Sequence, residues 1–204
     1  MTDSSETDIL ENFLEGAVET PQIDFKASCP WESGSFAKDF LAMSNTIDGG
    51  RIIIGVTEEE DGSFVREGIT SEDKRTFKID TMKDQLAKYA DPFVEFSISF
   101  PKDSRGLEYC VIRIEPFKEV PVICKIPDTT RGLYAGGIYY RNRNKRVESA
   151  LVSNSYDMRD IIERAMLKMR HKAKLIGYIM PTATDDEIFM KALESRLKIE
   201  RGEL

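Results

Sequence analysis

The stretch from residue 18 to residue 56 constrains the fold most, because it combines a short strand, a helix, a glycine turn and a buried strand. Residues 22–27 have the alternation of a strand, and residues 36–46 place apolar side chains at helical spacing. Two adjacent glycines then lead into residues 51–57, whose continuous Ile-Ile-Ile run is typical of a strand covered on both faces. These segments predict a sheet with a helix packed against it.

The rest of the chain alternates between helical and strand patterns. Apolar periodicity predicts these further helices and strands: helices at 8–16, 76–89, 157–172 and from Thr184, and strands at 94–100, 108–115, 120–126 and 137–141. Residues 1–7 are polar and acidic without periodicity, so we expect a disordered tail. The predicted class is α+β. One mixed sheet with flanking helices would occupy residues 8–150, and a helical C-terminal extension would follow over 151–204.

Composition narrows the setting. The 204 residues are 41% hydrophobic and contain no apolar run of the length, about 18 residues, that crosses a membrane. The N-terminal segment is acidic, which differs from a basic secretion signal. The three cysteines have no metal-binding or disulfide spacing, and an odd count indicates a reducing compartment. We therefore expect a cytoplasmic protein without a membrane partner.

Two carboxylates beside a lysine form the first candidate site. Asp24 and Lys26 project to the same side of the predicted strand, and Glu19 lies just upstream. Carboxylates gathered at one point favour a divalent cation such as Mg²⁺ or Mn²⁺, which activates water and stabilises charge on a phosphate. The alternative is an ordinary surface ion pair between Asp24 and Lys26, worth under about 1 kcal/mol.

The same region carries a family resemblance. The chain resembles the Schlafen AlbA-2 domain, also described as a divergent AAA or DNA-binding domain. The matching motifs are Glu19, Asp24-Phe25-Lys26, Ser44-Asn45-Thr46, Gly49-Gly50, residues 52–56, Pro121-Val122 and Tyr139-Tyr140-Arg141. The resemblance covers roughly residues 14–147, most of the chain. The resemblance implies an AlbA-like sheet and nucleic-acid binding, in roles such as host defence or transcriptional control.

In the nuclease members of this family, an acid after the Gly-Val of the buried strand completes a three-carboxylate site. Here Thr57 has that place and is followed by Glu58 and Glu59. The resemblance thus implies Glu19, Asp24 and Lys26 as catalytic residues. The metal ligands would be Glu19 and Asp24, with Glu58 or Glu59 as the third acid. The third ligand is either displaced or lost, and whether the chain is an enzyme stays open.

The turn residues Asn45, Gly49 and Gly50 form a second motif. Glycine permits close backbone approach, and asparagine tolerates left-handed turns, so we expect a structural turn between helix and strand. Some family members are described as ATP-binding. This chain lacks the Gly-x-x-x-x-Gly-Lys-Ser/Thr loop, so the sequence does not favour ATP as a cofactor.

Charge is distributed unevenly along the chain. The net charge is −7, but residues 1–61 hold 3 Lys/Arg against 14 Asp/Glu, whereas residues 121–176 hold 12 against 5. The basic part includes two tyrosines followed by an arginine-rich run, a composition suited to phosphate contact and base stacking. The predicted nucleic-acid-binding residues are Tyr140, Arg141, Arg143, Lys145 and Arg146. The alternative is an edge strand that positive charge protects from aggregation.

The C-terminal extension suggests a second class of function. Residues 156–172 and 184–201 each have an apolar stripe, which indicates helices that dock on another surface. We expect a homo-oligomer or a protein partner to use them. The rival to a nucleic-acid-binding protein or metal-dependent nuclease is therefore a non-catalytic adaptor, which oligomerises or docks on a partner ATPase through these helices.

Overall fold

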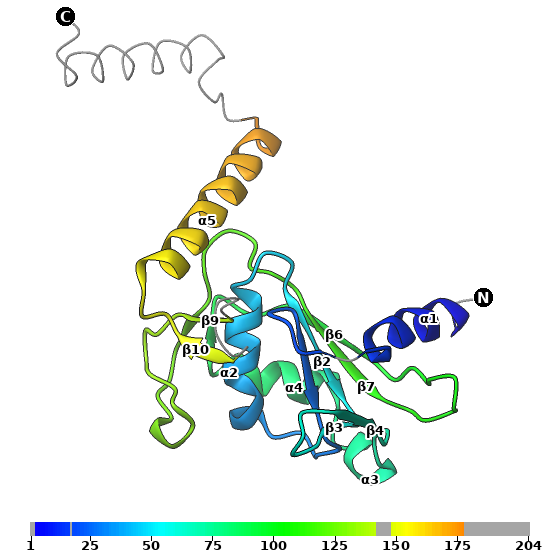
Figure 1. Cartoon of the computed structure of the whole chain (residues 1–204). Helices are drawn as coiled ribbons and strands as arrows, with labels where there is room; N and C mark the ends of the chain where they lie inside the picture. The colour runs from blue at the N-terminus through cyan, green and yellow to red at the C-terminus, as the bar shows by residue number, and fades with distance from the viewer. Residues whose placement is uncertain (1–2, 17, 142–147, 178–204) are drawn as a thin grey trace, which may run out of the picture. The chain divides into compact units, whose positions relative to one another are not determined.

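The computed structural model describes residues 3–16, 18–141 and 148–177 of the chain (Figure 1). The helical segments are α1 (Asp3–Leu14), α2 (Ser33–Ser44), α3 (Ser71–Lys74), α4 (Ile79–Leu86), the 3-10 turn η1 (Thr129–Arg131) and α5 (Ser155–Leu175). The strands are β1 (Ile23–Lys26), β2 (Gly50–Ile54), β3 (Val56–Glu58), β4 (Phe64–Arg66), β5 (Ala90–Asp91), β6 (Phe96–Ser99), β7 (Cys110–Ile114), β8 (Ile123–Cys124), β9 (Tyr139–Arg141) and β10 (Ser149–Leu151). The predicted α+β class is confirmed.

A four-stranded mixed sheet with the order β1-β2-β7-β6 organises the chain. β1 and β2 are parallel because α2 forms the crossover between them, and β7 is antiparallel to both of its neighbours. β6 and β7, at the predicted strands 94–100 and 108–115, form an antiparallel hairpin. Three two-stranded pairs surround the sheet: β3 with β4, β5 with β8, and β9 with β10.

Apolar side chains cover both faces of this sheet, as the Ile-Ile-Ile run predicts. On one face, Ile52 and Ile54 pack with the buried aromatic residues of α2. On the other, Ile53 packs with Leu10 and Leu14 of α1. Alternate residues of β2 thus serve different layers, and Figure 1 shows α2 lying against the strands.

Several boundaries differ from the sequence-based expectations. α1 begins at Asp3, within the stretch expected to be a polar tail. The predicted strand over 51–57 is interrupted at Gly55, where a φ of 114° ends β2 and begins β3. The helix predicted over 76–89 is shorter, and α3 precedes it as a separate turn. The helix predicted from Thr184 lies outside the described residues.

The chain divides into two compact units at Ala165, the first extending to that residue and the second from Met166 onward. α5 begins in the first unit and ends in the second. Within the described ranges, no helix combines the length and the apolar character needed to cross a membrane.

Candidate functional site

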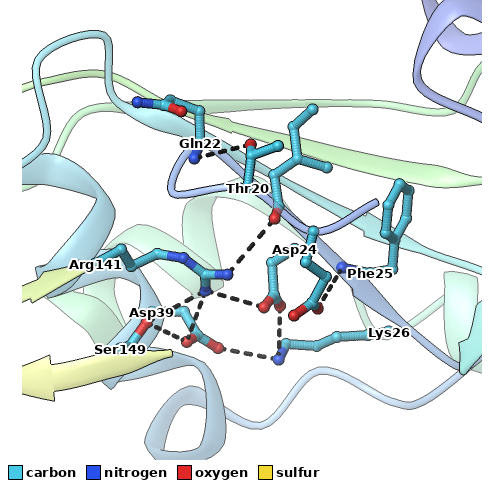
Figure 2. Close-up of polar contacts among 10 residues, drawn as sticks. Thr20, Gln22, Asp24, Phe25, Lys26, Asp39, Arg141 and Ser149 are labelled. Carbon is cyan, nitrogen blue, oxygen red and sulfur yellow. Dashed lines mark hydrogen bonds and ion pairs between the residues drawn. The ribbon is translucent and has the colours of Figure 1, made fainter. Parts of the chain in front are cut away.

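Five polar side chains from four separate elements converge at β1, an edge strand of the four-stranded sheet (Figure 2). They are Asp24 and Lys26 of β1, Asp39 of α2, Arg141 of β9 and Ser149 of β10. Residues 24 and 26 share one side of β1 because strand side chains alternate. Arg141 and Ser149 are opposite partners in the β9–β10 pair, so one rung of that ladder supplies both. We call these five residues the charge cluster.

Each carboxylate of the charge cluster contacts two cations. Lys26 Nζ lies 2.8 Å from Asp24 Oδ2 and 3.0 Å from Asp39 Oδ2. Arg141 Nη1 donates to Asp24 Oδ1 at 2.9 Å and lies 3.7 Å from Asp39 Oδ1. Ser149 Oγ donates to Asp39 Oδ1 at 2.7 Å. Figure 2 shows these contacts as a closed ring of charges.

The charges of this ring are buried, so their pairing matters for the stability of the fold. Arg141 is 1% exposed, and Asp24 and Asp39 are 7% and 9% exposed. A buried charge is costly unless it is paired, and here two negative groups face two positive groups. Burial alone would lower the pKa of Lys26, but Asp39 and Asp24 outweigh that effect and raise its pKa. The raised pKa favours the charged ammonium form of Lys26.

Glu19 lies beside the charge cluster without joining its ring. Its Oε1 accepts the backbone N–H of Phe25 at 3.3 Å. Burial, and next the negative charge of Asp24, raise the pKa of Glu19, and Glu58 adds a smaller repulsion. Glu19, Asp24 and Glu58 are thus close enough to influence one another.

The third acid required for a nuclease site is not brought into contact with the first two. The Thr57 hydroxyl donates to Glu67, and both Glu58 and Glu59 are exposed. Among the described residues, no group of three His, Cys, Asp or Glu side chains is arranged to hold a metal ion. Both oxygens of Asp24 face cationic nitrogens, so a divalent cation would have to displace Lys26 or Arg141 to bind this carboxylate. The assignment of metal ligands stays a prediction.

The predicted nucleic-acid-binding residues have different positions. The prediction for Arg141 requires a surface position, but the residue is buried. Its guanidinium pairs with Asp24 of β1 and Asp39 of α2, which makes a buried position tolerable. Tyr140 is half-buried and donates its hydroxyl to Asp160, and burial together with this bond raises its pKa to about 12. The remaining predicted residues, Arg143, Lys145 and Arg146, lie outside the described residues.

The turn after α2 is held by the side chain of Asn45, which is fully buried. Its Nδ2 donates to the carbonyls of Val122 and Tyr139 at 2.9 and 3.0 Å, and its Oδ1 accepts the N–H of Val122 at 2.9 Å. Arg164 of α5 donates to the Asn45 carbonyl at 2.6 Å. A single asparagine thus joins the turn to Val122, just before β8, and to Tyr139 of β9.

Gly49 adds a backbone requirement to this turn. Its φ is 71°, in the left-handed region that favours glycine. A Cβ at this position would overlap the carbonyl oxygen of Ile114 on β7. The turn therefore approaches the sheet more closely than a side chain permits.

Comparison with known proteins places this geometry in a family. The family model described as "Schlafen, AlbA_2" matches residues 19–149, which is more than half of the chain. The chain belongs to the Schlafen AlbA_2 family. The match begins at Glu19 and ends at Ser149, so it includes the whole charge cluster.

Solved structures are similar to the chain at low sequence identity. One is the DIP2311 protein from Corynebacterium diphtheriae, with 16% identity and a TM-score of 0.46 over 78% of this chain and 29% of that chain. Another is the N-terminal domain of a RecG-related protein from Nitrosomonas europaea, with 17% identity and a TM-score of 0.47 over 72% of this chain and 94% of that one. The chain thus spans less than a third of the DIP2311 protein. No curated protein matches it.

Three residues of this AlbA_2 site were missed by sequence reasoning: Asp39, Ser149 and Arg164. The spacing of α2 gave one usable signal, because Asp39 lies between the buried residues Phe36 and Phe40 on the apolar side of the helix. An acid in such a position is rare unless it is paired. Ser149 and Arg164 have no comparable local signal, because the partners that bury them are distant in sequence.

Proposed function

We propose that this AlbA_2 chain binds nucleic acid, RNA or DNA, through the basic segment that joins β9 to β10. The observation that carries the proposal is the anchoring of Arg141. This residue ends β9, and the run of Arg143, Lys145 and Arg146 follows it directly. The charge cluster and Asn45 fix the strand from which the run departs.

The chemistry of the segment supports phosphate contact. Three cationic side chains fall within four residues, just after the end of β9. Arg141 is paired with Asp24 and Asp39. The residues proposed to contact phosphate are therefore fewer than the sequence suggested: Arg143, Lys145 and Arg146. Binding of this kind releases counterions and weakens as salt increases.

Fluorescence anisotropy with labelled single-stranded RNA, transfer RNA and DNA tests the proposal. The triple variant Arg143→Glu, Lys145→Glu, Arg146→Glu should lose binding. Neutral replacement of one of the three by glutamine should reduce the slope of log K against log salt by about one. A matched variant, Lys78→Glu, Lys83→Glu, Lys88→Glu, changes the charge equally around α4, where all three lysines are exposed. Equal loss in both triple variants would show a nonspecific charge effect and would overturn the proposal.

Metal-dependent nuclease activity is a finer proposal with weaker structural support. It is favoured by Glu19, whose carboxylate is crowded by Asp24 and Glu58. It is opposed by the ion pairs that occupy both oxygens of Asp24. A nuclease reading therefore requires Asp24 to exchange Lys26 or Arg141 for another partner.

Assembly through α5 is the second candidate function, and an exposed apolar stripe favours it. Residues along one side of α5 and just beyond it follow spacings of four, three, four and three positions: Ile162, Met166, Met169, Ala173 and Ile176. The four larger side chains are between 48% and 69% exposed. This is the spacing of helices that pair along a seam. An adaptor that self-associates through α5 would leave the charge cluster as a purely structural feature.

A further inference from the structure

The sheet face under α1 contains two rows of side chains with different chemistry. The strand register places one row across β1, β2, β7 and β6: Ile23, Arg51, Arg113 and Ser97. The adjacent row on the same face is Phe25, Ile53, Val111 and Ser99. The apolar members of the second row pack with Leu10 and Leu14 of α1. The first row thus brings two arginines together at the margin of an apolar layer.

Arg51 and Arg113 are direct cross-strand partners, an arrangement of like charges that destabilises a sheet. Arg113 Nε is 2.9 Å from Glu115 Oε1, which neutralises one of the two charges. Within the described residues, Arg51 has no carboxylate partner, and its guanidinium lies 5.0 Å from the ring centroid of Phe13. Burial and the nearby Arg113 lower the pKa of Arg51. The two arginines of this row thus share one carboxylate, Glu115, which pairs directly with Arg113 and acts on Arg51 only from a distance.

A groove of about 360 Å³ opens at this row. Both arginines line it, together with the hydroxyl-bearing Ser97 and Ser99 of β6. Phe13 of α1 forms part of its apolar wall. Two guanidinium groups that share one carboxylate and two hydroxyl groups therefore meet in one concave space, on the sheet face opposite α2.

We propose that this groove binds a phosphate group through Arg51 and Arg113. Guanidinium groups match the geometry of phosphate oxygens, and hydrogen bonds between such charged groups are the strong ones. Cross-strand partners have Cα atoms about 4.5–5.5 Å apart, and both arginines line the same groove, so we expect one tetrahedral anion to contact both guanidinium groups. The hydroxyls of Ser97 and Ser99 supply further donors from β6. The apolar wall suits a phosphate carried on an organic body.

The phosphate has two possible sources, a free phosphate or mononucleotide and the backbone of a polynucleotide. The site does not depend on the basic segment at 142–147, which belongs to the proposed nucleic-acid function. If the ligand is a polynucleotide, the groove extends that function. Arg51→Gln then measures the contribution of the groove to binding, and the triple variant of Arg143, Lys145 and Arg146 measures that of the basic segment.

Amide chemical shifts of the full-length chain test the groove. The probes are inorganic phosphate, adenosine 5′-monophosphate and a short oligonucleotide, each compared with sodium chloride at equal ionic strength. We expect saturable shifts at Arg51, Ser97, Ser99 and Arg113 with at least one probe. Arg51→Gln should weaken that binding by about tenfold, since it removes a charged hydrogen-bond donor. Lys88→Gln, an exposed control near α4, should bind as the unmodified chain does.

Thermal unfolding separates ligand binding from a structural role of Arg51. The probe that gives saturable shifts should raise the melting temperature of the unmodified chain, and at the same concentration it should raise that of Arg51→Gln less. Without phosphate, Arg51→Gln should melt at the same or a higher temperature, because it relieves the repulsion with Arg113. Shifts with inorganic phosphate or the mononucleotide identify a free phosphate, whereas shifts with the oligonucleotide alone identify a polynucleotide. Absence of saturable shifts with all three probes, or equal binding by Arg51→Gln, overturns the proposal.

Discussion

Arg141 on β9 donates a hydrogen bond to Asp24 on β1 at 2.9 Å, across 117 positions of the chain. β9 does not belong to the four-stranded sheet, so backbone pairing with that sheet does not position it. The side-chain pair contributes to its position instead, together with the buried ring of Tyr139 and with Asn45, which donates to the Tyr139 carbonyl. The stability of this connection is the first property to test.

Replacing Arg141 with methionine should cost about 3–5 kcal/mol of unfolding free energy, because Asp24 and Asp39 lose a buried partner. Urea denaturation measures the change. Lys118→Met is the control, since Lys118 pairs with Glu95 at an exposed position and should cost less than about 1 kcal/mol. Similar small losses in both variants would mean that the charge cluster does not anchor β9.

Asn45→Ala should destabilise the chain by about 3 kcal/mol, because it removes three hydrogen bonds and leaves the Val122 and Tyr139 groups buried without partners. Asn154→Ala provides a comparison. Asn154 is exposed and accepts the N–H of Asp157 at the start of α5, so its loss should cost only about 1 kcal/mol. Equal effects in urea denaturation would contradict the role given to Asn45.

Glu11 predicts a pH dependence of stability. Its carboxylate accepts the N–H of Ser104 and pairs with Arg66, which lowers its pKa from the ordinary 4.5 to about 2. Because folding lowers this pKa, the stabilisation is present above pH 4.5 and is lost as the pH falls towards 2. The melting temperature of Glu11→Gln should be lower than that of the unmodified chain at pH 7, and the difference should shrink through that window. A difference independent of pH would exclude an ionised Glu11 as the cause.

The nuclease proposal predicts that any cleavage requiring Mn²⁺ is abolished by Asp24→Asn and by Glu19→Gln. A neutral amide is a poor ligand for a hard cation. Circular dichroism must accompany Asp24→Asn, since this change also weakens the pair with Arg141. Glu60→Gln, at an exposed position, is the matched control and should leave cleavage intact. Cleavage that survives both site variants and a chelator does not come from this site.

The assembly proposal predicts that Met166→Glu with Met169→Glu lowers the solution mass of the full-length chain in light scattering. Charge in a seam between helices opposes pairing. Leu167→Glu is the control, because Leu167 is equally exposed on α5 but lies off the stripe. If the full-length chain and all variants have the mass of a monomer, self-association through α5 is wrong.

The sheet and its two covered faces were predictable because their signals are local. The Ile-Ile-Ile run of β2 and the spacing of α2 report burial directly. The charge cluster was predictable only in part. Asp24 and Lys26 share a strand, but Asp39 and Arg141 reach them through tertiary packing. A run of basic residues in a sequence indicates an exposed surface. The burial of Arg141 could be predicted only by knowing that Asp24 and Asp39 pair with it.

Gly49 has a consequence for how this chain is compared with its relatives. Any side chain there would collide with the Ile114 carbonyl, so a saturation library at this codon should return almost only glycine. Such intolerance resembles that of a catalytic residue, although Gly49 has no group that reacts. If relatives keep a glycine at this turn, the close approach of two backbone segments is a sufficient reason. Such relatives need not share a substrate.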